Sequence, residues 1–469
     1  MTLRSNSADQ PLPSSFRDPS GYVFQREGEI YRKVNPCYLE TYARFMESGL
    51  YAELVSKKLL VSHAVVDEPD LTRDGGVVIL PRRIPVVSYP YEWSFQQLKD
   101  AALLTLSIAG VALKHGMVLK DASAYNVQFL DGEPVFIDTL SFEPYEEGSP
   151  WVAYGQFCRH FLAPLYLAAR KDYRCMLLTR DFIDGVPLDY ARALLGPPRR
   201  LSLTEIVHLR LHARLQRSKA GDQGKSTQGK RLPKSALLGL LDSLESGVRK
   251  LEWKPGRTEW GDYYSHTNYT DQASLDKKER IAEMIESLQP EVVWDIGAND
   301  GTYSRIAAKN AKQVVALDID PVAVNANYKK SRRDKETNLL PLLMDFTNPS
   351  PGIGWLCAER EALFARASAD LVMALAVVHH FCISNNVSLE RLVDFFASIT
   401  RGRVLVEFVP KSDSQVEILL ATREDVFPRY ELEAFKHAFD VHFELERERT
   451  IQGSGRTLLL FKKRGMDAR

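Results

Sequence analysis

Residues 292–301 read Val-Val-Trp-Asp-Ile-Gly-Ala-Asn-Asp-Gly, and residues 314–318 read Val-Val-Ala-Leu-Asp. The first stretch is an apolar run that continues into a loop with Gly297 and Gly301, and the second ends on Asp318. Glycine allows a tight turn and a close approach of a ligand, and a helix that begins after the loop points free N–H groups at that ligand. An acidic side chain at the end of the next strand can bind both ribose hydroxyls. Together the two stretches predict a nucleoside pocket.

The loop alone would also suit a dinucleotide, a phosphate or a plain tight turn. Asp295 at the strand end would repel a pyrophosphate and attract a cationic amino-acid group, or it would only cap the next helix. The order Asp-x-Gly-x-x-x-Gly also differs from the Gly-x-Gly-x-x-Gly of dinucleotide sites. In these features residues 255–463 resemble the class I S-adenosylmethionine-dependent methyltransferases. Asn299 replaces the middle glycine of that family's loop, and Asn is the residue after glycine that best tolerates a left-handed backbone.

The resemblance implies a set of residues that bind S-adenosyl-L-methionine. Asp295, Gly297 and Gly301 would frame its methionine end, Asp318 would bind the ribose, and Asp345 and Phe346 would bind the adenine. Taken alone, Asp345 would be a turn residue. The full set is Asp295, Gly297, Asn299, Gly301, Asp318, Asp345, Phe346 and Tyr269.

The segment Leu-Ala-Val-Val-His-His-Phe at 375–381 resembles the end of the family's fourth strand, which lies beside the transferred methyl group. His379 and His380 are therefore candidate catalytic residues, because histidine titrates near neutral pH and can orient a nucleophile or accept its proton. The alternative is that one of these histidines only packs against its neighbours and the other caps a helix. Aromatic residues upstream would close a lid over the cofactor or would pack between domains: Trp260, Tyr263, Tyr264 and Tyr269.

After Pro290 the chain alternates between short β-rich runs and helical spacers, which predicts a parallel sheet with helices on both faces. The last two runs flank Gly453 and Gly455 like a hairpin, so one edge strand is expected to be antiparallel. The predicted fold class is α/β, a C-terminal Rossmann-like seven-stranded methyltransferase sheet preceded by an α+β protein-kinase-like domain. The seven expected runs are 291–296, 313–318, 339–344, 370–375, 402–409, 440–446 and 456–462.

The kinase-like expectation comes from residues 115–143, where Asp121, Asn126 and Asp138 are spaced as in small-molecule phosphotransferases of the aminoglycoside and choline type. The resemblance implies that the first aspartate receives the hydroxyl proton while the other two residues hold magnesium, with Mg-ATP as the donor. These three residues would be catalytic only if the domain is active. No Gly-rich phosphate loop precedes them, and Lys120 stands where the family has Arg or Gly. A degenerate binding domain, an active kinase and a chance similarity stay open.

We expect a flexible N-terminus at 1–20, a kinase-like domain at 21–216, a linker at 217–234 and the methyltransferase domain at 235–469. The linker is rich in Lys and Gly and is a solvated tether. A nucleic-acid-binding tail is the alternative, but no aromatic residues interleave its charges.

The chain has 61 basic residues (Lys and Arg) and 61 acidic residues (Asp and Glu), so its formal net charge is zero. A neutral chain has no overall electrostatic attraction for nucleic acid. Five scattered cysteines indicate free thiols in a reducing compartment. There is no apolar signal core, and the longest apolar run, Ala101–Leu113, is too short to span a bilayer. We expect a soluble cytoplasmic protein. No residue cluster has the spacing of metal ligands, and the oligomeric state is open.

Three functions compete. The first is a methyltransferase whose kinase-like domain binds or regulates, the second an enzyme that also phosphorylates a small molecule, and the third a non-catalytic protein with a structural cofactor. The whole chain resembles a family of bacterial methyltransferases, nodulation proteins among them, fused to such a domain. That resemblance implies a small-molecule or glycan-related acceptor, without naming the acceptor atom.

Overall fold

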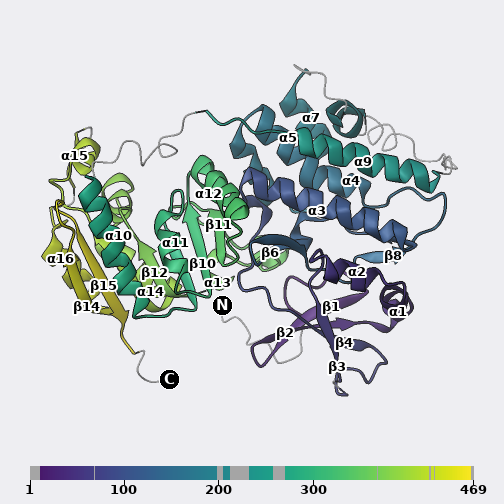
Figure 1. Ribbon diagram of the computed structural model, residues 1–469, viewed down its shortest axis with the longest axis horizontal. Helices are drawn as coiled ribbons and strands as arrows, with labels where there is room; N and C mark the ends of the chain where they lie inside the picture. The colour runs from purple at the N-terminus through teal and green to yellow at the C-terminus, as the bar shows by residue number, and fades with distance from the viewer. Residues whose placement is uncertain are drawn as a thin grey trace. The chain divides into compact units, whose positions relative to one another are not determined.

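The computed structural model describes residues 11–67, 69–197, 204–211, 232–256, 270–366, 368–421, 424–426 and 428–465. Internal contacts divide the chain into two compact units (Figure 1). The first unit comprises Met1–Lys254 and Gly352–Glu361, and the second comprises Pro255–Pro351 and Ala362–Arg469.

The second unit is built on a seven-stranded sheet in the order β11-β10-β9-β12-β13-β15-β14. Its strands are β9 (Val292–Ile296), β10 (Gln313–Asp318), β11 (Leu339–Leu343), β12 (Ala369–Ala374), β13 (Thr400–Phe408), β14 (Phe443–Thr450) and β15 (Thr457–Lys463). Every β-rich run expected from the sequence forms one of these strands. The first five pair in parallel, as expected. One detail is corrected: the antiparallel strand, β15, lies inside the sheet between β13 and β14, because the hairpin folds back so that its second strand pairs with β13.

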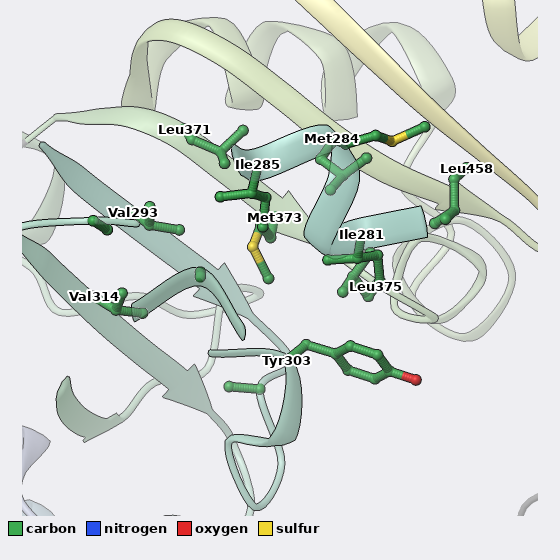
Figure 2. Packing of buried hydrophobic residues seen from close by; sticks show 14 of the residues in the cluster. Ile281, Met284, Ile285, Val293, Tyr303, Val314, Leu371, Met373, Leu375 and Leu458 are labelled. Carbon is green, nitrogen blue, oxygen red and sulfur yellow. The ribbon is translucent and has the colours of Figure 1, made fainter. Parts of the chain in front are cut away.

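Helices cover both faces of this sheet. On one face, α10 and α11 pack their apolar side chains against alternate residues of the strands, and Figure 2 shows Ile285 beside Met373 and Ile281 beside Leu375. On the other face α16 lies against the sheet, where the Phe439 ring stacks on that of Phe461 at 4.2 Å. The helices of the unit are α10 (Asp271–Glu286), α11 (Thr302–Ala308), α12 (Pro321–Asp334), α13 (Leu363–Arg366), α14 (Leu389–Ile399), α15 (Ser414–Leu420) and α16 (Leu432–Phe439).

The first unit combines a four-stranded antiparallel sheet, in the order β1-β2-β4-β3, with two further strand pairs and several helices. Strands β1 and β2 form a hairpin, and helix α3 begins after the N-cap Ser94. Its strands are β1 (Gly21–Arg26), β2 (Glu29–Val34), β3 (His63–Val66), β4 (Val77–Pro81), β5 (Met117–Leu119), β6 (Val127–Leu130), β7 (Glu133–Phe136) and β8 (Phe142–Pro144). Its helices are α1 (Leu39–Glu47), α2 (Leu50–Ser56), α3 (Phe95–Lys114), α4 (Tyr154–Phe157), α5 (Ala163–Arg170), α6 (Leu178–Asp181), α7 (Leu188–Leu195) and α9 (Lys234–Lys250).

Helix α9 lies in the first unit, although the sequence places it at the start of the methyltransferase domain. Leu237, Leu241 and Leu244 are buried along one side of α9, which packs against α3. The Lys99 ammonium donates to the carbonyl oxygens of Arg249 and Leu251, both at 2.8 Å. It thereby provides hydrogen bonds to backbone carbonyl groups at the C-terminal end of α9. The contact units therefore divide after α9. Most of the expected linker, 217–231, lies outside the described residues.

Residues 11–20 are held in place, in contrast to the loose N-terminus expected for 1–20. Pro11 bridges to Phe24, and the Arg17 guanidinium donates to both carboxylate oxygens of Glu359, at 2.7 and 2.9 Å. Within the described part of the chain, no helix is long and apolar enough to cross a membrane.

Candidate active site

The loop after β9 forms a cradle whose backbone needs residues that tolerate positive φ. Gly297 has φ +73°, Asn299 +49° and Gly301 +79°. A Cβ added at Gly301 would lie 2.5 Å from the side-chain amide of Asn327 on α12, so this position also lacks room for a side chain. The asparagine at the middle position adopts the left-handed conformation, as the sequence predicted.

Asp318 joins this loop to the end of β10. One of its carboxylate oxygens accepts from the Asn299 N–H at 2.7 Å, and the other accepts from the Asp320 N–H at 2.8 Å. The side chain is 7% exposed, and burial raises the pKa of Asp318 to about 6, against the lowering effect of these backbone donors. The carboxylate is therefore fixed in direction at the carboxyl edge of the sheet.

Asp295 lies under the same loop. Its Oδ2 accepts from the Ser304 hydroxyl of α11 at 2.6 Å, which joins the strand to the following helix. Burial raises the pKa of Asp295 to about 7, and the Lys277 ammonium acts in the opposite direction. This contact is to a side-chain hydroxyl, whereas the backbone N–H of Thr302 in the first turn of α11 donates to Asp300, so Asp295 is not seen to cap the helix.

Asp345 and Phe346 follow β11, next to Asp318, whose carbonyl oxygen accepts from the Met344 N–H at 2.8 Å. The Asp345 Oδ1 accepts from the backbone and hydroxyl of Thr347, as a turn residue would. The Phe346 ring contacts that of Phe395 at 5.7 Å. The structure thus brings the third-strand residues to the edge that holds Asp318.

The segment after β12 returns to the same edge. The Val377 side chain would lie 3.1 Å from a Cβ added at Gly297, so the fourth strand ends against the loop of the first. His379 and His380 follow, with ring centroids 4.1 Å apart. Burial lowers the pKa of both, that of His380 to about 4, so both imidazoles are neutral at pH 7. A neutral imidazole can accept a proton.

A family model described as a methyltransferase domain matches residues 294–401, which run from β9 into β13. The nodulation protein NoeA of Rhizobium meliloti (strain 1021) is 36% identical over 466 residues, which is 96% of each chain. The chain belongs to the family of NoeA. Together with the match to the methyltransferase domain, this makes it an S-adenosylmethionine-dependent methyltransferase. The resemblance to nodulation proteins that the sequence suggested is confirmed.

Solved structures give weaker likenesses. The N-methyltransferase NodS from Bradyrhizobium japonicum WM9 is 10% identical, with a TM-score of 0.32 over 41% of this chain and 97% of that chain. The magnesium protoporphyrin IX methyltransferase of Synechocystis PCC 6803 is 15% identical, with a TM-score of 0.31 over 45% of this chain and 90% of that chain. Neither likeness bears on the acceptor.

The aromatic residues expected to form a lid, Trp260, Tyr263, Tyr264 and Tyr269, lie outside the described residues.

No sequence pattern indicated the buried group of charges that lies at the same end of the sheet. The Lys277 ammonium of α10 donates to Glu407 Oε2 of β13 at 2.6 Å, and the Arg456 guanidinium contacts Glu407 at 3.4 Å and Asp413 at 2.8 Å. Lys277 also lies over the Tyr303 ring, 4.4 Å from its centroid. These residues come from four distant parts of the chain, and only the topology brings them together.

In the first unit, Asp121, Asn126 and Asp138 come together around the ends of β5, β6 and β7. The Asp121 Oδ1 accepts from the Gln156 amide at 2.7 Å, and the Asn126 amide donates to the Ser141 hydroxyl at 3.4 Å. Burial and the nearby Asp138 raise the pKa of Asp121.

The carboxylate of Asp138 is bound by hydrogen-bond donors of the protein itself. The Arg32 guanidinium lies 2.6 Å from its Oδ1, the Leu140 N–H donates to the same oxygen at 3.0 Å, and the Ser141 hydroxyl donates to Oδ2. A guanidinium thus lies where the kinase resemblance expects a metal ion. Lys33, the next residue of β2, pairs with Asp74 at 2.6 Å.

Proposed function

We propose that this methyltransferase acts on a small-molecule or glycan-related acceptor. We further propose that it binds S-adenosyl-L-methionine through Asp295, Gly297, Asn299, Gly301, Asp318, Asp345 and Phe346, with Tyr269 from the segment outside the described residues. The observation that carries the binding site is Asp318, a buried carboxylate oriented by the Asn299 N–H at the carboxyl edge of a parallel sheet. Ligands of open α/β sheets bind at this edge.

The residues present suit such a cofactor. Gly301 has φ +79°, and the side chains of Asn327 and Arg305 fill the place of a Cβ, so glycine is required for the tight turn of the loop. Asp318 presents a fixed carboxylate that can accept hydrogen bonds from two ribose hydroxyls. Ile319, which follows it, is 54% exposed and offers an apolar surface at the same edge. Asp295, whose pKa burial raises to about 7, adds negative charge under the loop in its ionised form, which favours a ligand that carries positive charge.

When bound, S-adenosylmethionine supplies a methyl group already activated on a sulfonium. The protein then has to hold the acceptor in line and exclude water. His379 and His380 are proposed to act at the acceptor, since neutral imidazoles at the end of the fourth strand can orient a nucleophile or accept its proton. The Gly297–Val377 contact supports this role, because it joins the end of β12 to the cofactor loop.

The test is to incubate the full-length protein with methyl-labelled cofactor and fractionated metabolite and glycan extracts. Transfer of label to a small molecule or glycan in one fraction is the expected result. Cofactor that binds but never transfers its methyl group to any small-molecule or glycan fraction would refute the proposed acceptor class.

A second candidate function belongs to the first unit, which we propose is kinase-like over 21–216 and degenerate. The grouping of Asp121, Asn126 and Asp138 supports the likeness. The Arg32–Asp138 ion pair favours a binding role over phosphoryl transfer, because the guanidinium occupies the carboxylate that would hold magnesium. Magnesium-dependent ATP turnover that disappears in Asp121→Asn would instead show an active kinase.

The remaining expectations stay proposals. The methyltransferase domain is proposed to lie within 235–469, although α9 packs with the first unit. A reducing, cytoplasmic location is proposed from the cysteines, all of which are free thiols.

A further inference from the structure

His379 carries a buried polar atom without a partner. Its side chain is 3% exposed, and its Nδ1 has no hydrogen-bond partner. A buried nitrogen left in this way costs free energy, so such atoms in native structures call for an explanation. His379 also follows the strand whose end packs against Gly297. A group supplied by a ligand would satisfy this nitrogen.

Tyr430 provides a second such atom. Its side chain is 2% exposed, its ring stacks on Phe408 at 5.2 Å, and its hydroxyl makes no hydrogen bond of acceptable geometry. The Val409 backbone is near enough to lower the pKa of Tyr430, but burial dominates and raises that pKa well above its usual range. The phenol is therefore neutral and has a proton to donate.

Strand pairing places both atoms at one edge of the sheet. Strand β12, which ends at Ala374 before His379, pairs in parallel with β13, where Ala374 lies beside Val406. Tyr430 stacks on Phe408 at the end of β13. Arg456 acts on the pKa of His379 and of Tyr430. Lys277 acts on the pKa of His379 and of Asp295, which lies under the cofactor loop.

This neighbourhood favours an uncharged acceptor. Lys277 and Arg456 are matched by Glu407 and Asp413 in direct ion pairs. The cofactor itself brings one positive charge, on its sulfonium, and a charged acceptor group would add a second, unmatched charge to a desolvated region, at a large cost. A neutral hydroxyl needs one acceptor for its proton and can use one donor for a lone pair. His379 Nδ1 and the Tyr430 hydroxyl supply these two functions.

We propose that His379 and Tyr430 bind the acceptor as an uncharged alcohol or sugar hydroxyl, and that the enzyme methylates oxygen. This inference rests on the proposed function. The hydroxyl accepts a hydrogen bond from Tyr430 and donates its proton to His379 Nδ1. The acceptor oxygen forms a bond to the methyl carbon as the carbon–sulfur bond breaks, and the electron pair of that bond stays on sulfur. The proton on His379 passes to solvent after the methyl ether leaves.

The binding test uses two cofactor analogues and no acceptor. S-adenosylhomocysteine lacks the methyl group, and sinefungin carries an amine in its place. That amine is protonated at pH 7, so it reproduces the positive charge of the cofactor's sulfonium, and it would reach His379 and Tyr430. Calorimetry on the full-length protein should show sinefungin bound about ten- to a hundredfold more tightly, as a charge-assisted hydrogen bond at this position provides. His379→Leu and Tyr430→Phe should each reduce this preference and leave the affinity for S-adenosylhomocysteine unchanged.

His437→Leu is the matched control, because His437 is exposed on α16 of the same unit, and it should keep the preference. Tyr430→Phe removes only a hydroxyl and carries the test if His379→Leu does not fold. Binding of both analogues without a preference, or a preference that both variants keep, overturns the inference and leaves the cofactor site standing. Failure of wild type to bind either analogue overturns the proposed function as well.

A second measurement addresses the bond that is formed. The labelled product from the extract experiment should be a methyl ether, which is stable in mild alkali. Release of labelled methanol in mild alkali would identify a methyl ester, and label on nitrogen would identify an amine acceptor. Either result overturns the proposal.

Discussion

Among single residues, the cofactor loop is the part of the site that the sequence predicts best. Gly297, Asn299 and Gly301 are required by backbone conformation, and Asp318 by the hydrogen bonds it must accept. Such requirements restrict the residue type at each position and therefore leave a recognisable pattern. Ser304 and Asn327, which contact Asp295 and Gly301, left no pattern because many residues can fill a supporting position.

Gly301→Ala should weaken cofactor binding and destabilise the second unit. A left-handed alanine costs about 1–2 kcal/mol, and its Cβ would also collide with the Asn327 amide. Asn299→Gly is the matched control, and it should not weaken binding, since glycine adopts positive φ freely. Thermal unfolding and calorimetry with S-adenosylhomocysteine measure both effects. A Gly301→Ala variant with wild-type affinity would argue against the cradle.

The affinity for the cofactor should depend on pH. Burial raises the pKa of Asp318 to about 6, and that of Asp295 to about 7. The ionised carboxylates bind the ribose hydroxyls and the cationic end best, so the neutral forms that dominate at lower pH should bind more weakly. Affinity should therefore fall as pH drops from 7 to 5, with proton release on binding in that range. Asp318→Asn should lose part of this dependence, and a flat profile in wild type would contradict it.

At the scale of secondary-structure elements, the spacing of apolar residues and the residues typical of turns predicted the seven strands of the second unit. Buried parallel strands are short apolar runs bounded by loops, so they are visible in the sequence. The pairing of β15 inside the sheet was not predicted, since sequence separation does not show which strand of a hairpin meets β13. The position of α9 was missed for a related reason. Its apolar stripe of Leu237, Leu241 and Leu244 requires a partner surface, but it does not say which one.

Leu244→Ala should destabilise the first unit and spare the second. Leu244 is fully buried on α9, and truncating a buried leucine costs about 2–5 kcal/mol. Hydrogen exchange followed by mass spectrometry should show faster exchange in α3 and α9, with β9 to β13 unchanged. Ser246→Ala, at an exposed position of the same helix, serves as the control. Faster exchange confined to β9–β13 would place α9 with the methyltransferase sheet.

For the whole molecule, two units of one chain carry two different arrangements of carboxylates. In the second unit, Asp295 and Asp318 lie at a loop shaped for a ligand. In the first, Asp138 is paired with Arg32. The charged group of Lys277, Glu407 and Arg456 could not be predicted, because its members are scattered along the chain and each alone resembles a surface residue.

Asp138→Ala should leave methyl transfer unchanged if the first unit is a binding or scaffold domain. The substitution leaves Arg32 without its closest carboxylate, so its effect should be confined to the stability and ligand binding of that unit. Rates with methyl-labelled cofactor, together with circular dichroism to verify folding, provide the measurement. A folded variant that loses methyl transfer would show that the two units are coupled.

The most direct test of the account is calorimetric titration of S-adenosylhomocysteine into the full-length protein and into Asp318→Ala. The wild type should bind one equivalent, and the variant should bind about 1.5–3 kcal/mol more weakly, because hydrogen bonds to a charged acceptor are lost. Asp334→Ala, on the surface at the end of α12, should bind as wild type does. Equal affinities for wild type and Asp318→Ala would contradict the assignment of the cofactor site.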